Sequence, residues 1–224
     1  AVVVGDRHRA PDRRAQGLGI QIFEVGRDLP RDPATWAILQ SISTAWLRHK
    51  GKKELDFMIG ELPVTDDPAD PHTQRRRIFV AAGPPPDNRQ DCLPIAALPD
   101  RNLHALGFIT YVPASGAQPG YLHDLTRRVP TAPPGCMELC NAHAIDRLRA
   151  EGVPYLHFGF TPFVVPDVPL PAGGSRLLAR LITLLARHGS FVYPAHSQAD
   201  YKRKWGPDVI DAEYVAARPL SVRA

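Results

Sequence analysis

The chain has 224 residues, of which 44% are apolar and 22% are charged, and its formal net charge is +4. This apolar content excludes intrinsic disorder, and the length suits one large domain or two small ones. No run of about 18 apolar residues occurs, which excludes a transmembrane helix in this sequence, and three cysteines cannot form a disulfide framework. We therefore expect a protein of the reducing cytoplasm.

The predicted elements begin with two strands, at 1–4 and 19–25, and we interpret residues 1–27 as a remnant or linker of a preceding unit. The chain starts inside an apolar run, so we expect further chain upstream. A single domain is predicted over 28–224. Its predicted helices are 33–49, 137–149, 175–187 and 197–205, and its predicted strands are 55–59, 78–82, 106–112, 120–127, 155–163 and 209–217. Polar or proline-rich loops are predicted at 61–74, 83–103 and 164–174. This order predicts an α+β or α/β sheet domain with helices on its faces.

The polar strand at 120–127 is the first candidate site. Strict alternation puts one set of side chains on one face, namely Tyr121, His123, Leu125 and Arg127. It puts the others, namely Leu122, Asp124 and Thr126, on the opposite face. Because an unpaired buried carboxylate is costly, Asp124 is either a structural ion-pair residue or a site residue. Arg127 and Arg128 lie before a helix start at Gly135, where arginine and helix amides suit an anion; the alternative is two solvated arginines.

A basic segment near the C-terminus is the second candidate. Lys202 and Lys204 are two of only five lysines in the chain, and they alternate with Tyr201, Arg203 and Trp205. Cations between aromatic rings suit a phosphate-bearing or nucleic-acid partner, because the rings can stack. The alternative is an exposed basic helix end.

The predicted helix at 175–187 carries Arg176, Arg180 and Arg187 on one face and leucines on the other. It is either a core-packing helix with a solvated face or a helix that lies on an anionic membrane. Cys136 and Cys140, four residues apart on a helix, are predicted to be small core residues. No CxxC or HExxH spacing occurs, so we expect no zinc site.

Five short motifs share their order with a known family. They read Trp46-Leu47 ahead of Asp56-Phe57-Met58-Ile59-Gly60-Glu61, Asp124-Leu125-Thr126-Arg127, Pro133-Pro134-Gly135-Cys136-Met137-Glu138, Phe158-Gly159-Phe160-Thr161-Pro162-Phe163, and Lys202-Arg203-Lys204-Trp205-Gly206-Pro207. With these motifs the chain resembles the C-terminal catalytic domain of the aminoacyl-phosphatidylglycerol synthases, the lysyl- and alanyl-phosphatidylglycerol synthase group. The resemblance covers about residues 40–215.

The resemblance implies a GNAT-like (N-acyltransferase-like) mixed sheet flanked by helices. It implies transfer of an aminoacyl group from aminoacyl-tRNA to a hydroxyl acceptor, most commonly the headgroup of phosphatidylglycerol. No cofactor and no metal are implied. The implied location is the cytoplasm, including the inner face of the membrane, with peripheral membrane contact as an option.

The resemblance also implies which residues line the site. Catalytic roles fall on Asp124, Arg127 and Lys204, and substrate-binding roles fall on Lys202, Arg128, Glu138, Tyr201, Trp205 and Thr161. In this hypothesis a lysine of the closing motif binds the tRNA 3′ phosphates or stabilises the developing oxyanion. Arg127 binds an anionic phosphate, and Asp124 orients Arg127 or a substrate group.

Three other functions stay open. The first is the same transfer to a sterol or a small natural-product precursor. The second is acyl-CoA-dependent N-acetyl transfer. The third is a non-catalytic module that binds tRNA or lipid. The stretch at 127–136 has one glycine and three prolines. Because proline lacks the amide donor that would bind a CoA pyrophosphate, this stretch argues against CoA.

Overall fold

The computed structural model describes residues 2–4, 17–50, 62–63, 65–85, 92–161, 174–188 and 195–211. They belong to two compact units, one formed by residues 8–158 and the other by residues 1–7 together with 159–224.

The first unit contains a curled mixed sheet in which the strands follow the order β2-β3-β4-β5-β6. The strands are β2 (Gln21–Glu24), β3 (Arg77–Gly83), β4 (His104–Ala114), β5 (Gly120–Arg128) and β6 (Tyr155–His157). The first three pairings are antiparallel, whereas β5 and β6 are parallel. A parallel pair needs a long crossover, and the helix α4 (Cys136–Ala150) supplies it.

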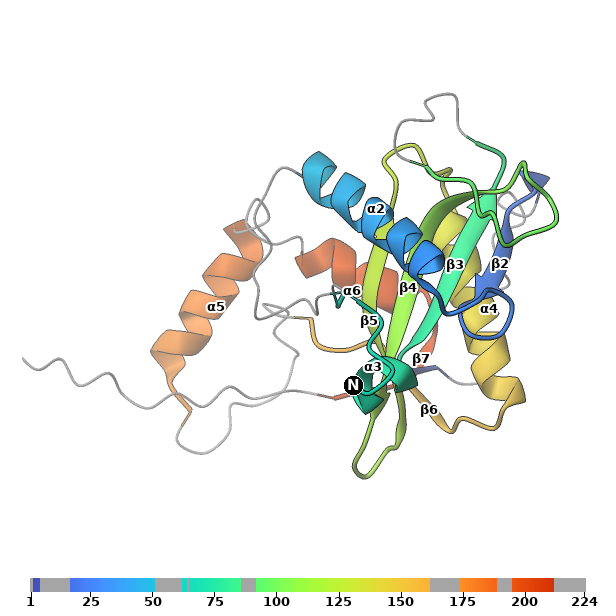
Figure 1. Ribbon diagram of the computed structural model, residues 1–224. Coiled ribbons are helices and arrows are strands. Elements are labelled where there is room, and N and C mark those ends of the chain that lie inside the picture. The colour runs from blue at the N-terminus through green and yellow to red at the C-terminus, as the bar shows by residue number, and fades with distance from the viewer. Residues whose placement is uncertain are drawn as a thin grey trace, which may run out of the picture. The chain divides into compact units, whose positions relative to one another are not determined.

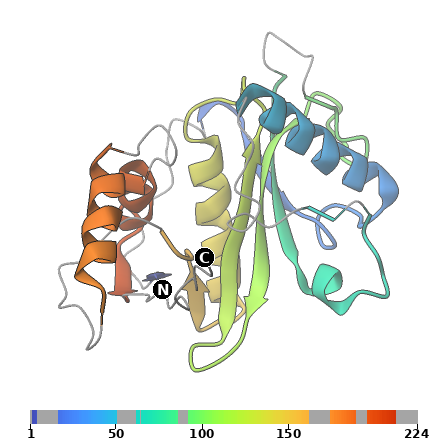
Figure 2. The ribbon, with the colours of Figure 1, turned by 90° about the vertical axis from the view of Figure 1, so that its left-hand side faces the viewer.

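Helices cover both faces of this sheet. Helix α2 (Pro33–Lys50) packs on β4 and β5, while α4 packs on β2, β3 and β4 from the opposite side (Figures 1 and 2). The short helix α3 (Pro71–Arg75) lies on the same side as α2. Asp32 caps the first turn of α2, since its carboxylate accepts a hydrogen bond from the Thr35 amide at 2.8 Å.

The core of the first unit lies between the sheet and these helices. Its largest fully buried side chains are Tyr111, Phe79, Phe108, Leu39, Ile42, Ile78, Ile95, Leu106, Ile109 and Leu125. One side of α4 is buried, and Cys136 and Cys140 are core residues as predicted. Tyr111 donates a hydrogen bond to Asn141 of α4, which ties the helix to the middle of the sheet.

The described residues of the second unit form two helices and one strand pair. Helices α5 (Arg176–His188) and α6 (Ala195–Arg203) were both predicted, with shifts of one or two residues at their ends. Strand β1 (Val2–Val4) pairs antiparallel with β7 (Pro207–Ile210).

Two predicted boundaries are wrong. Residues 71–75 form helix α3 inside the predicted loop, because Asp70 caps it by accepting bonds from the amides of His72 and Thr73. Strand β6 ends at His157, whereas the prediction ran it to residue 163. Its pairing with β5 stops at His157, and Gly159 has a φ of +68° that interrupts extended backbone.

Several predictions are not settled by the described residues. The strand at 55–59 and the motif around it lie outside them, as do residues 162–173 and 212–217. The domain boundary between residues 27 and 28 stays a prediction. Strand β2, which precedes that boundary, pairs with β3 in the first unit.

Candidate functional site

A β-bulge in β5 reorganises the polar strand. Ile109 of β4 pairs with Thr126 and Tyr111 pairs with His123, so that Thr110 alone faces two residues of β5, Asp124 and Leu125. The extra residue shifts the alternation of the strand. Asp124 and Arg127 therefore lie on the same face, and the strict alternation predicted for residues 121–127 is wrong.

Contacts identify the two faces. On the side covered by α2, Thr110 donates a hydrogen bond to Asp124 at 3.2 Å, and the Arg127 guanidinium lies 4.0 Å from the ring centre of Trp46. On the side covered by α4, His123 Nε2 lies 3.2 Å from the hydroxyl of Thr126. The bulge thus places Asp124 and Arg127, the acidic and the basic residue of the Asp-Leu-Thr-Arg motif, on the face of the sheet that α2 covers.

Asp124 has a defined electrostatic setting. Its carboxylate forms an ion pair with Arg76 at 3.0 Å, and the side chains of Asp124 and Arg76 are only 15% and 14% exposed. Burial raises the pKa of Asp124, while Arg76, the Thr110 hydrogen bond and the charge of Arg127 act in the opposite direction. The partner that a buried aspartate requires is therefore present, and it is Arg76.

Arg127 and Arg128 differ although they are adjacent in sequence. Arg127 is 4% exposed and lies against Trp46, so the interpretation of two solvated arginines is wrong for it. Arg128 is exposed and donates to the carbonyl of Ala132, on the path towards α4. A buried guanidinium on an aromatic ring is held in place.

The start of α4 carries Glu138 in its first turn, half-buried, after Gly135 with a φ of +83°. The thiols beside it are poor nucleophiles. Burial raises the pKa of Cys136 to about 12 and raises that of Cys140 as well. Since the thiolate is the reactive form, covalent catalysis by these cysteines is disfavoured.

The closing motif lies in the second unit, and its two lysines have different environments. Lys202 Nζ donates to the carbonyls of Gly159 at 3.1 Å and of Phe160 at 2.9 Å. Lys204 is exposed, and its ammonium lies 4.6 Å from the ring centre of Tyr201. Lys202 thereby fixes the irregular segment that leads to Thr161.

The aromatic residues of this motif form a pair. The rings of Tyr201 and Trp205 lie 6.2 Å apart in an edge arrangement, and Trp205 is only 3% exposed. Trp205 is therefore part of the packing of α6 rather than an open stacking platform. Tyr201 is half-buried and carries the Lys204 contact.

Helix α5 differs from the expectation of a core-packing helix. Three of its leucines are exposed, with fractions of 70% for Leu177, 48% for Leu181 and 56% for Leu184. Arg176 and Arg180 beside them are exposed too. The core-packing interpretation is wrong for these three leucines.

The predicted site residues fall into two groups. Asp124, Arg127, Arg128 and Glu138 belong to the first unit, whereas the second unit holds Thr161, Tyr201, Lys202, Lys204 and Trp205. Sequence reasoning missed Arg76 and Thr110, the direct partners of Asp124. The run Arg75-Arg76-Arg77 at the start of an apolar strand is the one signal that could have indicated a buried cation.

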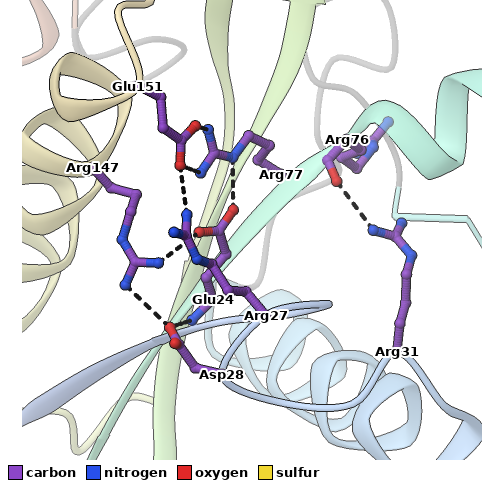
Figure 3. A network of polar contacts seen from close by, with 8 residues as sticks. All are labelled: Glu24, Arg27, Asp28, Arg31, Arg76, Arg77, Arg147 and Glu151. Carbon is purple, nitrogen blue, oxygen red and sulfur yellow. Dashed lines mark hydrogen bonds and ion pairs between the residues drawn. The ribbon is translucent and has the colours of Figure 1, made fainter.

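A second ion-pair network joins strands β2 and β3 to helix α4 (Figure 3). Arg77 pairs with Glu24 at 2.6 Å and also with Glu151 after α4, and Arg147 of α4 reaches Glu24 at 3.5 Å. These bonds join β2 and β3 to the C-terminal end of α4, a structural role that needs no substrate.

Two kinds of feature are absent from the part of the chain that the structure describes. No group of three or more histidine, cysteine, aspartate or glutamate side chains there could hold a metal ion. None of the described helices combines the length and the apolar content that a membrane span requires.

Comparisons with known proteins agree with this architecture. The model of the family described as "Phosphatidylglycerol lysyltransferase, C-terminal" matches residues 8–217. Among solved structures, L-PGS from Bacillus licheniformis is similar with a TM-score of 0.57 and 18% identity, over 87% of this chain and 50% of that one. A C-terminal domain assigned to a lysylphosphatidylglycerol synthetase of Agrobacterium fabrum gives a TM-score of 0.56 and 18% identity, over 87% and 49%.

These two similarities concern the fold, which is α+β and GNAT-like. The chain spans about half the length of each of the two solved structures. No protein of curated function matches it.

Proposed function

Because the chain belongs to the family of the phosphatidylglycerol lysyltransferase C-terminal domain, we propose that it transfers an aminoacyl group from aminoacyl-tRNA to a hydroxyl acceptor, with phosphatidylglycerol as the foremost candidate. The observation that carries this proposal is the family match over residues 8–217. It is supported by the bulge that gathers Asp124 and Arg127, two residues of a shared motif, on one face.

The proposed reaction is an ester exchange. The acceptor oxygen forms a bond with the ester carbonyl carbon, the bond from that carbon to the tRNA ribose oxygen breaks, and the acceptor proton ends on the ribose oxygen. Such a step needs a placed acceptor, a stabilised carbonyl oxygen and a proton path, and it needs no external energy source.

Roles can be proposed for the residues of the first unit. The Asp124 carboxylate orients the hydroxyl group of the acceptor substrate or takes its proton. Arg127 provides a fixed positive charge for a phosphate or for the developing oxyanion. The Trp46 contact supports this role because it restrains a guanidinium that is otherwise flexible. Arg128 and Glu138 are proposed to contact the substrates near the start of α4.

The residues of the second unit suit the tRNA donor. Lys204 is exposed and restrained by Tyr201, so we assign it to the phosphates at the tRNA 3′ end or to the oxyanion. Lys202 already binds two carbonyls, which favours a role in shaping the segment of Thr161 over direct contact with phosphate. Trp205 is buried against the Tyr201 ring of α6, which suits a supporting role better than direct stacking on a base.

Helix α5 supports a lipid acceptor. Its exposed leucines, Leu177, Leu181 and Leu184, stand beside the exposed cations Arg176 and Arg180. An amphipathic helix of this kind suits the surface of an anionic bilayer. We propose peripheral contact with such a surface, and flotation with phosphatidylglycerol vesicles, compared with phosphatidylcholine vesicles, tests it.

The test of the function uses a pool of tRNAs charged with labelled amino acids, together with phosphatidylglycerol vesicles and a lipid extract. The expected result is labelled lipid whose formation is abolished by RNase treatment of the donor. Labelled small molecule without labelled lipid would assign the acceptor to a metabolite or sterol. Labelled product from acetyl-CoA alone would overturn the proposal in favour of an N-acetyltransferase.

Variants connect this activity to the site. Asp124→Ala, Arg127→Ala and Lys204→Ala are expected to lose transfer while the circular dichroism spectrum stays native. Arg203→Ala is the matched control for Lys204→Ala, because Arg203 is adjacent and its side chain is 59% exposed. Retained tRNA binding with no turnover in wild type would favour a binding module.

A further inference from the structure

We propose that Arg76 is a positioning residue that holds the Asp124 carboxylate in its working orientation. This inference rests on the proposed function, because it assigns a purpose to the carboxylate. Arg76 is absent from all the motifs of the sequence analysis and stands at the joint between α3 and β3.

The geometry supports a fixed contact. Arg76 Nη1 lies 3.0 Å from Asp124 Oδ2, and the same oxygen accepts the Thr110 hydroxyl at 3.2 Å. Since only about one seventh of either ionic side chain is exposed, water competes weakly with this pair. A carboxylate held by two donors has one preferred orientation on the face under α2.

The backbone of Arg76 is held as well. Arg31 donates to the carbonyl of Arg76 at 3.3 Å (Figure 3). It also donates to the carbonyl of Thr73 at 2.6 Å and pairs with Asp66 at 2.6 Å. The Arg76 amide donates to Thr73, closing the last turn of α3. The anchor of Asp124 is thus attached to the segment that leads into α2.

Arg76 also retains a donor. Its Nε is buried and has no hydrogen-bond acceptor among the described residues. A guanidinium that used all its donors would be a purely structural cation, whereas this one can still donate a hydrogen bond to an oxygen placed beside Asp124.

Two charged groups act on Asp124, namely Arg76 just before β3 and Arg127 on β5. The hydroxyl of Thr110 on β4 adds a hydrogen bond to the carboxylate. Removing the Arg76 cation removes the largest influence that opposes burial. The pKa of Asp124 in Arg76→Met is therefore expected to lie above that in wild type, and Arg76→Lys is expected to lie between the two.

The test measures the Asp124 carboxyl titration by carbon NMR, with Asp124→Asn identifying the resonance, in wild type, Arg76→Met, Arg76→Lys and the control Arg75→Met. Arg75 is adjacent and exposed, so its replacement should change nothing. Transfer is then measured against pH. We expect kcat of Arg76→Met to fall roughly 100-fold, as for a misplaced reacting group, and the acid limb to move to higher pH.

The outcomes separate the two proposals. An unchanged Asp124 titration, or a fall in kcat with no shift of the acid limb, would overturn the positioning role, even with the transferase proposal intact. If wild type shows no transfer at all, the proposed function fails, and the positioning role fails with it. If Arg76→Met does not fold, the Arg76→Lys titration and pH profile decide.

Discussion

The contact between Arg127 and Trp46 predicts a measurable coupling energy. The guanidinium carbon lies 4.0 Å from the indole ring centre, and Arg127 is 4% exposed. Cation–π contacts contribute about 0.5–1 kcal/mol at exposed sites and about 2 kcal/mol when desolvated. Because Arg127 is buried and Trp46 is half-buried, we expect a coupling of about 1–2 kcal/mol.

The perturbation is a double-mutant cycle with Trp46→Leu, Arg127→Met and the double variant. Urea denaturation followed by far-ultraviolet circular dichroism gives the free energy of unfolding of each protein. Trp46→Leu alone should lower Tm by roughly 2–8 °C, since about 1 kcal/mol corresponds to about 2–4 °C at this chain length. The double variant should lose less than the sum of the single variants.

The control replaces the other tryptophan of α2. Trp36 is ten residues away, about 15 Å along the helix, and its indole donates to the carbonyl of Pro63 at 3.0 Å. Trp36→Leu combined with Arg127→Met should therefore be additive. A coupling between Trp46 and Arg127 below about 0.5 kcal/mol, the range within which distant sites add, would refute the reasoning.

The remaining predictions concern packing and burial. Arg77→Met should destabilise the fold by about 3 kcal/mol in urea, because it leaves the carboxylate of Glu24 buried without its closest partner; a change under about 1 kcal/mol would contradict this. Cys136, whose pKa is raised to about 12, should resist iodoacetamide at pH 8 until urea unfolds the chain, and fast native alkylation would contradict its burial. Gly120→Ala should destabilise by about 1–3 kcal/mol or more, because its Cβ would lie 1.9 Å from a carbonyl oxygen of β6, whereas Gly17→Ala, with no atom within 4 Å, should be neutral.

Helical periodicity was readable from the sequence because it is local. The helices predicted at 33–49 and 137–149 follow from apolar residues three or four positions apart, and α2 and α4 confirm both. Strand β6 was predicted too long because a strand ends where its partner leaves it. The residues of β5 that pair with β6 lie 35 positions earlier in the sequence, Gly120 opposite Tyr155 for example.

The candidate site likewise depends on pairings between residues that are distant in the sequence. The Asp-Leu-Thr-Arg motif was found, but the face on which each residue lies depends on one extra residue in β5 relative to β4. No periodicity within β5 reveals that bulge. Arg76, which lies 48 positions before Asp124, could be identified as its partner only through the pairing of β3, β4 and β5.

Mass balance during a single turnover tests the central claim most directly. The protein is mixed in excess with tRNA charged with a labelled amino acid and with phosphatidylglycerol vesicles, and the label on tRNA and on lipid is followed over time. We predict that each aminoacyl group lost from tRNA appears on lipid, and that Asp124→Asn abolishes the transfer. Label that leaves tRNA only at the uncatalysed hydrolysis rate, with none on lipid or any other acceptor in the mixture, would contradict the account.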